Sequence, residues 1–253
     1  MDKIRFFPAI EPGQELKQDW SKAYQSEFPT VYRNELMQKC QIHAKDGLLN
    51  EIFDREAYPK LSQIAQVKPI YCVDVLSAYG NSFLATVHGM SPEEIYDAWS
   101  NEQNSLTAVK SRRFDCDTLA IDISRPALEY GKKAGIFDSF ISADINNLSG
   151  AEEEQVSESL KAAHFVHLGS PGYITIERFN SIVETFSKGS EYGVLIVTFN
   201  YLFMKHHKEF KKSILEKLNF VNCVGGMQRD LVSTEIEHYK VARAYTTTWV
   251  MER

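Results

Sequence analysis

The chain has 253 residues, of which 43% are hydrophobic and 25% are charged, and its formal net charge is −6 at pH 7. This length suits one large α/β domain, or a domain with an appendage. The acidic balance argues against a general nucleic-acid-binding surface, which needs a basic face to displace counterions from phosphates. No apolar run approaches the roughly 20 residues needed to span a bilayer. We therefore expect neither nucleic acid nor a membrane as a partner.

The N-terminus and the cysteines predict a cytoplasmic protein. The opening residues, MDKIRFFPAIEPGQ, contain no long apolar region of the kind found in signal peptides. Cys40, Cys72, Cys116 and Cys223 lie far apart, with no CxxC motif and no histidine at metal-ligand spacing. We interpret them as reduced thiols, and we expect no metal site.

Residues 1–67 have a helical pattern that differs from the rest of the chain. Apolar side chains recur at helical intervals, for example at Trp20, Tyr24 and Phe28. Such helices cannot bury their apolar faces alone, so we predict that they form a cap or lid on a second domain, residues 68–253. A purely structural flanking bundle is the alternative.

From residue 68 onwards, apolar runs of strand length alternate with helical patterns. The predicted strands are 70–76, 118–123, 139–143, 164–168 and 193–199, and the predicted helices are 81–88, 91–101, 124–135, 151–163 and 175–189. This alternation indicates a parallel sheet covered on both faces. A helix over 207–219 and strands over 220–230 and 244–253 follow. The predicted fold is α/β and Rossmann-like, a mostly parallel seven-stranded sheet with a C-terminal antiparallel hairpin.

Three acids lie in or directly after the first three predicted strands. Asp74 lies within the first strand, Asp122 ends the second, and Asp144 follows the third. In open α/β sheets, ligands bind beyond the carboxyl ends of the strands. Asp122 is placed to accept both hydroxyl protons of a ribose, and Asp144 to accept from the exocyclic amine of adenine. Together the acids indicate an adenosine site, with the alternative that Asp122 only caps the following helix.

The stretches "VDVLSAYG", "LAIDIS" and "ISADINN" resemble the signature of class I S-adenosylmethionine (SAM)-dependent methyltransferases. That signature is an apolar strand running into D-x-G-x-x-x-G, an acid that ends the next strand, and an acid after the third. "LSAYGNSFLATVHGMSPEEIYDAW" is similar to a branch of small bacterial members with an S-Y-G loop. The resemblance covers roughly residues 68–203. It departs from the family at Leu76, where the family has glycine, so that only Gly80 remains.

The resemblance implies that SAM is the cofactor. The residues that it assigns to SAM binding are Asp74, Ser77, Tyr79, Gly80, Asp122, Ile123, Asp144, Ile145 and Gly169. The implied reaction is methyl transfer to a small molecule, an in-line displacement for which the enzyme supplies positioning and exclusion of water. Candidates for contact with the reacting groups follow the fourth and fifth strands: Tyr173 and Asn200, with Ser170, Tyr201 and Phe203 nearby. We interpret His167, inside the fourth strand, as a core histidine.

Two alternatives keep the same ligand. Some enzymes of this fold use SAM as a substrate: its own amino group attacks its γ-carbon, closes an azetidine ring and expels methylthioadenosine. The altered loop with Tyr79 and the aromatic residues of the leader, Trp20, Tyr24, Phe28 and Tyr32, fit such a cyclase or lyase. The other alternative is an inert SAM-binding protein, for which the missing glycine would be the mark. Neither the methyl acceptor nor the oligomeric state has a signal in the sequence.

Overall fold

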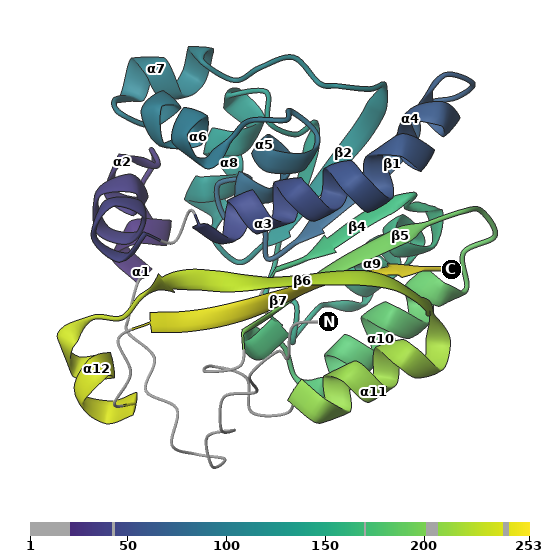
Figure 1. The fold of residues 1–253 in the computed structure, drawn as a ribbon. Coiled ribbons are helices and arrows are strands. Elements are labelled where there is room, and N and C mark those ends of the chain that lie inside the picture. The colour runs from purple at the N-terminus through teal and green to yellow at the C-terminus, as the bar shows by residue number, and fades with distance from the viewer. Residues whose placement is uncertain (1–20, 42–43, 170, 201–206, 240–242) are drawn as a thin grey trace.

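The computed structural model describes residues 21–41, 44–169, 171–200, 207–239 and 243–253, and the fold is drawn in Figure 1. It is built on a seven-stranded sheet with the strand order β3-β2-β1-β4-β5-β7-β6. The strands are β1 (Ile70–Val75), β2 (Cys116–Asp122), β3 (Ser139–Ser142), β4 (Phe165–Leu168), β5 (Val194–Asn200), β6 (Asn219–Asp230) and β7 (Arg243–Glu252). β1 to β5 are parallel, and β7 runs antiparallel to both β5 and β6. The predicted Rossmann-like sheet with its terminal antiparallel hairpin is confirmed.

Helices cover both faces of this sheet (Figure 1). One face carries α3 (Ala44–Ile52), α4 (Tyr58–Ala65), α5 (Asn81–Thr86), α6 (Pro92–Ala98), α7 (Glu102–Thr107) and α8 (Arg125–Lys133). The other face carries α9 (Gly150–Ala162), α10 (Ile176–Ser187) and α11 (His207–Lys217). The remaining helical segments are α1 (Ser21–Tyr24), α2 (Thr30–Tyr32), the π-helical turns η1 (Arg33–Gln38) and η2 (Phe53–Ala57), the 3-10 turn η3 (Pro171–Tyr173), and α12 (Ser233–Tyr239). α7 and α12 had not been predicted.

Alternating burial on the two faces explains the apolar runs of the strands. Val73 and Val166 pack in the cluster that contains α9, α10 and α11. Cys72 and Phe165, one position earlier, pack in the cluster of the opposite face. Since both faces are covered, nearly every strand residue must be apolar. Asp74, which is fully buried in β1, is therefore an exception that needs an explanation.

The described residues of the leader belong to the core on one face of the sheet. Leu36, Ile52, Phe53 and Leu61 are buried in the same apolar cluster as residues of β1 and β4. They pack onto the sheet as the amphipathic pattern requires, because isolated helices of this length are unstable in water. Residues 1–20 and 42–43, including Trp20, lie outside the described residues. The division into a cap and a second domain stays a prediction.

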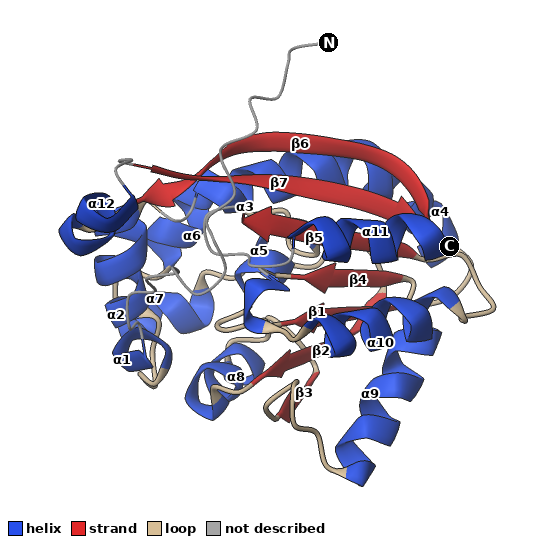
Figure 2. Cartoon of the chain, turned by 90° about the horizontal axis from the view of Figure 1, so that it is seen from below, coloured by secondary structure: helices blue, strands red, loops and turns tan. Residues whose placement is uncertain are grey.

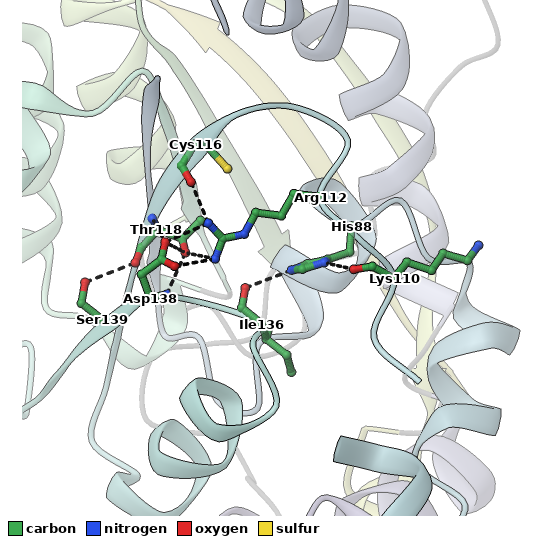
Figure 3. A network of polar contacts seen from close by, with 8 residues as sticks. All are labelled: His88, Lys110, Arg112, Cys116, Thr118, Ile136, Asp138 and Ser139. Atoms are coloured by element: carbon green, nitrogen blue, oxygen red, sulfur yellow. Dashed lines mark hydrogen bonds and ion pairs between the residues drawn. The ribbon is translucent and has the colours of Figure 1, made fainter. Parts of the chain in front are cut away.

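A polar network joins the amino ends of β2 and β3 (Figure 3). The Arg112 guanidinium donates to both carboxylate oxygens of Asp138, at 2.9 and 2.8 Å, and to the Cys116 carbonyl, at 2.7 Å. Asp138 also accepts from the backbone N–H and the hydroxyl of Thr118, at 2.9 and 2.8 Å. His88 lies beside this network, with each ring nitrogen against a backbone carbonyl. The hydrogen-bonding groups of Asp138 are thus satisfied within the protein.

In the described part of the chain, no helix combines the length and the hydropathy needed to cross a membrane. The same residues contain no group of three His, Cys, Asp or Glu side chains arranged to hold a metal ion. All four cysteines are described, and none of them forms a disulfide. The cytoplasmic location stays a prediction.

Candidate ligand site at the carboxyl ends of the strands

The strand order places a topological switch point between β1 and β4. From β1 the chain moves outward through β2 to β3, and then returns to β4 on the other side of β1. In open α/β sheets, the crevice at such a point, beyond the carboxyl ends of the strands, is where ligands bind. Figure 2 shows α1 and α2 toward the end of the sheet to which the parallel strands point. The segments that follow β1, β2, β3 and β4 are therefore the candidate site.

The turn after β1 has a left-handed backbone at alternate residues. The φ angles are +64° at Leu76, +49° at Ala78 and +85° at Gly80. A side chain in this conformation costs roughly 1–2 kcal/mol per residue. The turn keeps a shape that normally requires glycine, although leucine and alanine occupy two of its positions. Such strain persists only where the surroundings fix the backbone, and here Leu76 and Ser77 both donate their N–H groups to the Ile121 carbonyl.

Gly80 has a packing role that the sequence did not reveal. A Cβ atom at this position would lie 2.7 Å from Cγ2 of Ile136 and 3.3 Å from Cε1 of Phe137. The glycine therefore lets the start of α5 approach the segment that follows α8. Its predicted contact with a ligand stays a prediction.

Asp122 joins the turn after β1 to the start of α8. One carboxylate oxygen accepts from the Ser124 N–H at 2.8 Å, and the other accepts from the Ala78 N–H at 2.9 Å. The cap of α8 is the Ser124 hydroxyl, which accepts from the Ala127 N–H at 3.4 Å. Burial raises the pKa of Asp122, although the two backbone bonds favour its ionised form. Each carboxylate oxygen has a second lone pair, so the carboxylate can still accept from ligand hydroxyls.

The two isoleucines that follow the acids have opposite environments. Ile123 exposes 70% of its surface beside Asp122. Ile145 is only 4% exposed and packs in the cluster that contains α9 and α10. The structure thus places Ile123 on the outside and Ile145 in the core.

Asp144 organises the loop after β3. Its carboxylate accepts from the Asn146 N–H at 3.0 Å and from the Asn147 side chain at 2.6 Å. The Asn147 bond and then the Asn146 bond lower the pKa of Asp144, so the carboxylate is ionised at neutral pH. The Asn146 side chain donates to the Tyr173 carbonyl at 2.9 Å and accepts from the Thr175 N–H at 2.8 Å. The loops after β3 and β4 are therefore tied together.

The Tyr79 side chain links the turn after β1 to residues 23–26 of the N-terminal leader. Its hydroxyl faces the carbonyls of Ala23 and Ser26, at 2.8 and 2.7 Å, and the Ser124 hydroxyl donates to the Tyr24 carbonyl. The Tyr79 ring is fully buried, with its centroid 5.7 Å from that of Tyr32, 6.0 Å from Trp99 and 5.7 Å from Tyr130. Burial raises its pKa. Residues 23–26 consequently lie against the turn, and the Tyr79 ring is enclosed by protein.

Asp74 and His167 form a buried pair across the switch point. They are register partners on β1 and β4, and Nδ1 of His167 lies 2.8 Å from one Asp74 oxygen. The other Asp74 oxygen accepts from the Ser82 hydroxyl of α5. Nε2 of His167 and Oγ of Ser77, both buried, have no hydrogen-bond partner among the described residues. The sequence had suggested a ligand contact for Asp74 and a core role for His167, with no sign that they meet.

The other predicted residues are spread over the same end of the sheet. The Gly169 N–H donates to the Val75 carbonyl at 3.2 Å. Tyr173 is 58% exposed in η3, whereas Asn200 is 1% exposed at the end of β5. Their roles near the reacting groups stay predictions, and Ser170, Tyr201 and Phe203 lie outside the described residues.

Comparison with known proteins gives a fold but no family. No protein-family model and no curated protein matches the chain. Among solved structures, the CurJ carbon methyltransferase has a similar fold, with a TM-score of 0.52 at 10% identity over 89% of this chain and 59% of that chain. Magnesium protoporphyrin IX methyltransferase from Synechocystis PCC 6803, solved with bound SAM, matches at a TM-score of 0.46 and 10% identity, over 81% of this chain and 79% of that one. A protein from Thermoplasma acidophilum matches at a TM-score of 0.46 and 12% identity, over 84% of this chain and 97% of that chain. This chain spans about three fifths of CurJ, and likeness at such identity concerns the fold alone.

Proposed function

We propose that this chain is an enzyme that binds SAM at the carboxyl ends of β1 to β4 and transfers its methyl group to a small molecule. The observation that carries the proposal is the turn after β1. It has three left-handed positions at the switch point, Leu76, Ala78 and Gly80, and the Ala78 N–H donates to Asp122 of β2. The fold of a carbon methyltransferase agrees with this proposal.

The acids and Ile123 give SAM a definite orientation in this proposal. Asp122 accepts from the two ribose hydroxyls, Asp144 accepts from the exocyclic amine of adenine, and the exposed Ile123 covers one face of the base. The sulfonium and the amino-acid end then extend toward β1 and β4. The sulfonium already activates the methyl carbon, so the protein has to align the acceptor and exclude water.

Ring closure of SAM is the second candidate, and the unpartnered Nε2 of His167 favours it. If Nε2 takes a proton from the ammonium group, the free amine can attack the γ-carbon. The bond between this carbon and sulfur breaks, and the sulfur keeps the electron pair in neutral methylthioadenosine. The amino acid leaves as a four-membered ring whose nitrogen carries the positive charge, and the proton stays on the imidazole. Methyl transfer would instead leave S-adenosylhomocysteine.

Two measurements test these proposals. We expect SAM and S-adenosylhomocysteine to raise the melting temperature, since a ligand that binds only the folded state stabilises it. No shift with either compound would contradict SAM binding. Incubation with SAM alone then separates the reactions: methylthioadenosine with a ring-closed amino acid supports cyclisation, whereas stable SAM supports methyl transfer. The acceptor and the cytoplasmic location remain parts of the proposal.

A further inference from the structure

We propose that Nε2 of His167, held in place by Asp74, accepts a hydrogen bond from the ammonium group at the amino-acid end of SAM. This inference rests on the proposed function and adds to it a specific contact.

The hydrogen bonds of Asp74 determine the tautomer of His167. Asp74 is 0% exposed, and its two oxygens are shared between the Ser82 hydroxyl and Nδ1 of His167. A carboxylate only accepts hydrogen bonds, so Nδ1 carries the proton in this pair. In the neutral ring, Nε2 then has a free lone pair. The pair therefore presents an acceptor at Nε2.

The His167 ring extends toward Gly169, the residue that follows β4. Cε1 of His167, which is bonded to Nε2, lies 3.4 Å from the point that a Cβ of Gly169 would occupy. The ring thus leans along β4 toward its carboxyl end, at the switch point where a ligand is expected. Oγ of Ser77, in the turn after β1, is a second buried polar atom with no partner among the described residues.

An ammonium group suits this environment. It has three N–H donors and needs acceptors, and an imidazole nitrogen and a hydroxyl are both acceptors. A buried acceptor that has lost its water and gained no partner is unfavourable. A ligand donor that reaches Nε2 would remove that cost, and its charge would strengthen the bond. With adenosine at Asp122 and Asp144, the amino-acid end is the part of SAM that extends toward β1 and β4.

His164, next to the same strand, is a matched control for His167. It directly precedes β4, and its ring is also mostly buried, with 8% of the side chain exposed. Its Nδ1 accepts from the Tyr71 N–H at 3.1 Å, and its Nε2 faces Glu191 at 2.7 Å. Both nitrogens therefore have protein partners, and His164 lies at the amino end of β4, away from the proposed site.

The test compares two ligands in three proteins. S-adenosylhomocysteine carries the amino-acid end, whereas methylthioadenosine lacks it. Their dissociation constants are measured by calorimetry for the unaltered protein, His167→Asn and His164→Asn. The asparagine amide at position 167 can take the place of Nδ1 as the donor to Asp74, but it removes Nε2. The preference is the ratio of the dissociation constant for methylthioadenosine to that for S-adenosylhomocysteine. We expect His167→Asn to lower this ratio by about tenfold to hundredfold through weaker binding of S-adenosylhomocysteine, with its affinity for methylthioadenosine unchanged. His164→Asn should leave both affinities unchanged.

The outcomes separate this inference from the proposed function. If neither ligand binds the unaltered protein, the SAM site itself is wrong. If both bind and His167→Asn keeps the full preference, the SAM site stands and the contact with His167 is wrong. Should His167→Asn fail to fold, nitrogen NMR of the unaltered protein decides. We expect S-adenosylhomocysteine, but not methylthioadenosine, to shift the Nε2 resonance of His167, and equal responses to the two ligands would overturn the inference.

Discussion

The polar side chains at the two ends of the parallel strands differ in how many of their hydrogen-bonding atoms have partners. At the amino ends of β2 and β3, Arg112, Asp138 and Thr118 satisfy one another. At the carboxyl ends of β1 and β4, His167 and Ser77 each keep a buried atom without a partner in the described structure. Folded proteins leave few such atoms unpaired. The difference agrees with a stabilising role for the amino ends and with the ligand site proposed at the carboxyl ends.

The pKa values of Asp138 and Asp122, at opposite ends of the strands, shift in opposite directions. Burial opposes the ionisation of Asp138, but the bonds from Arg112 and Thr118 outweigh it, so its pKa is lowered. Burial dominates at Asp122, so its pKa is raised despite its two backbone bonds. Further hydrogen-bond donors, such as ribose hydroxyls, would stabilise the ionised form of a buried carboxylate like that of Asp122.

Arg112→Ala should produce the largest loss of stability. Its guanidinium makes four hydrogen bonds, two of them to a carboxylate. We expect the free energy of unfolding in urea to fall by about 2–3 kcal/mol. Each bond to a charged group is worth at most about 1.5–3 kcal/mol, and water screens this pair because the Asp138 side chain is 47% exposed. Arg125→Ala is the control, since its ion pair with Glu129 is exposed and such pairs contribute about 0.3–0.5 kcal/mol. Equal effects of the two changes would refute the stabilising role of the amino-end network.

Asp122→Ala should act mainly on the ligand. We expect its affinity for S-adenosylhomocysteine to weaken by about 1–3 kcal/mol, the cost of leaving ribose hydroxyls unpaired. Asp117→Ala, on the exposed side of the amino end of the same strand, should leave the affinity unchanged. Unchanged affinity in Asp122→Ala, measured by calorimetry, would mean that Asp122 only links the turn after β1 to α8.

Ala78→Gly tests the strain in the turn after β1. Glycine adopts a φ of +49° without a steric penalty, but it also loses more entropy on folding. We expect a net gain of up to about 1 kcal/mol in the free energy of unfolding. A loss of stability would show that the alanine backbone is not strained there.

The smallest expected effect is the change with pH in the contribution of Asp138 to the free energy of unfolding. Its pKa in the folded protein is lowered, so its stabilising contribution is present above the pKa of the unfolded chain and disappears as the pH falls through the folded value. We expect the stability difference between the unaltered protein and Asp138→Asn to shrink as the pH falls through this range. A difference that grew in acid would contradict the assigned direction. The effect is modest because the Asp138 side chain is 47% exposed.

The sequence was sufficient to predict the sheet but not the contacts at its carboxyl end. Runs of buried strand residues, separated by amphipathic helices, are local patterns, and they predicted all seven strands to within two residues at each end. The Asp74–His167 pair joins residues 93 positions apart, and it depends on the register of β1 against β4, which no local pattern encodes. The packing of Gly80 and Tyr79 was not predicted for the same reason, since their partners come from the segment after α8 and from the leader.

The most direct test of the account is a crystal structure of the complex with S-adenosylhomocysteine. We expect the ribose hydroxyls within hydrogen-bonding distance of Asp122, adenine against Ile123, and the amino group at Nε2 of His167. A complex in which the ligand binds elsewhere, with these strand ends empty or filled by protein side chains, would contradict it.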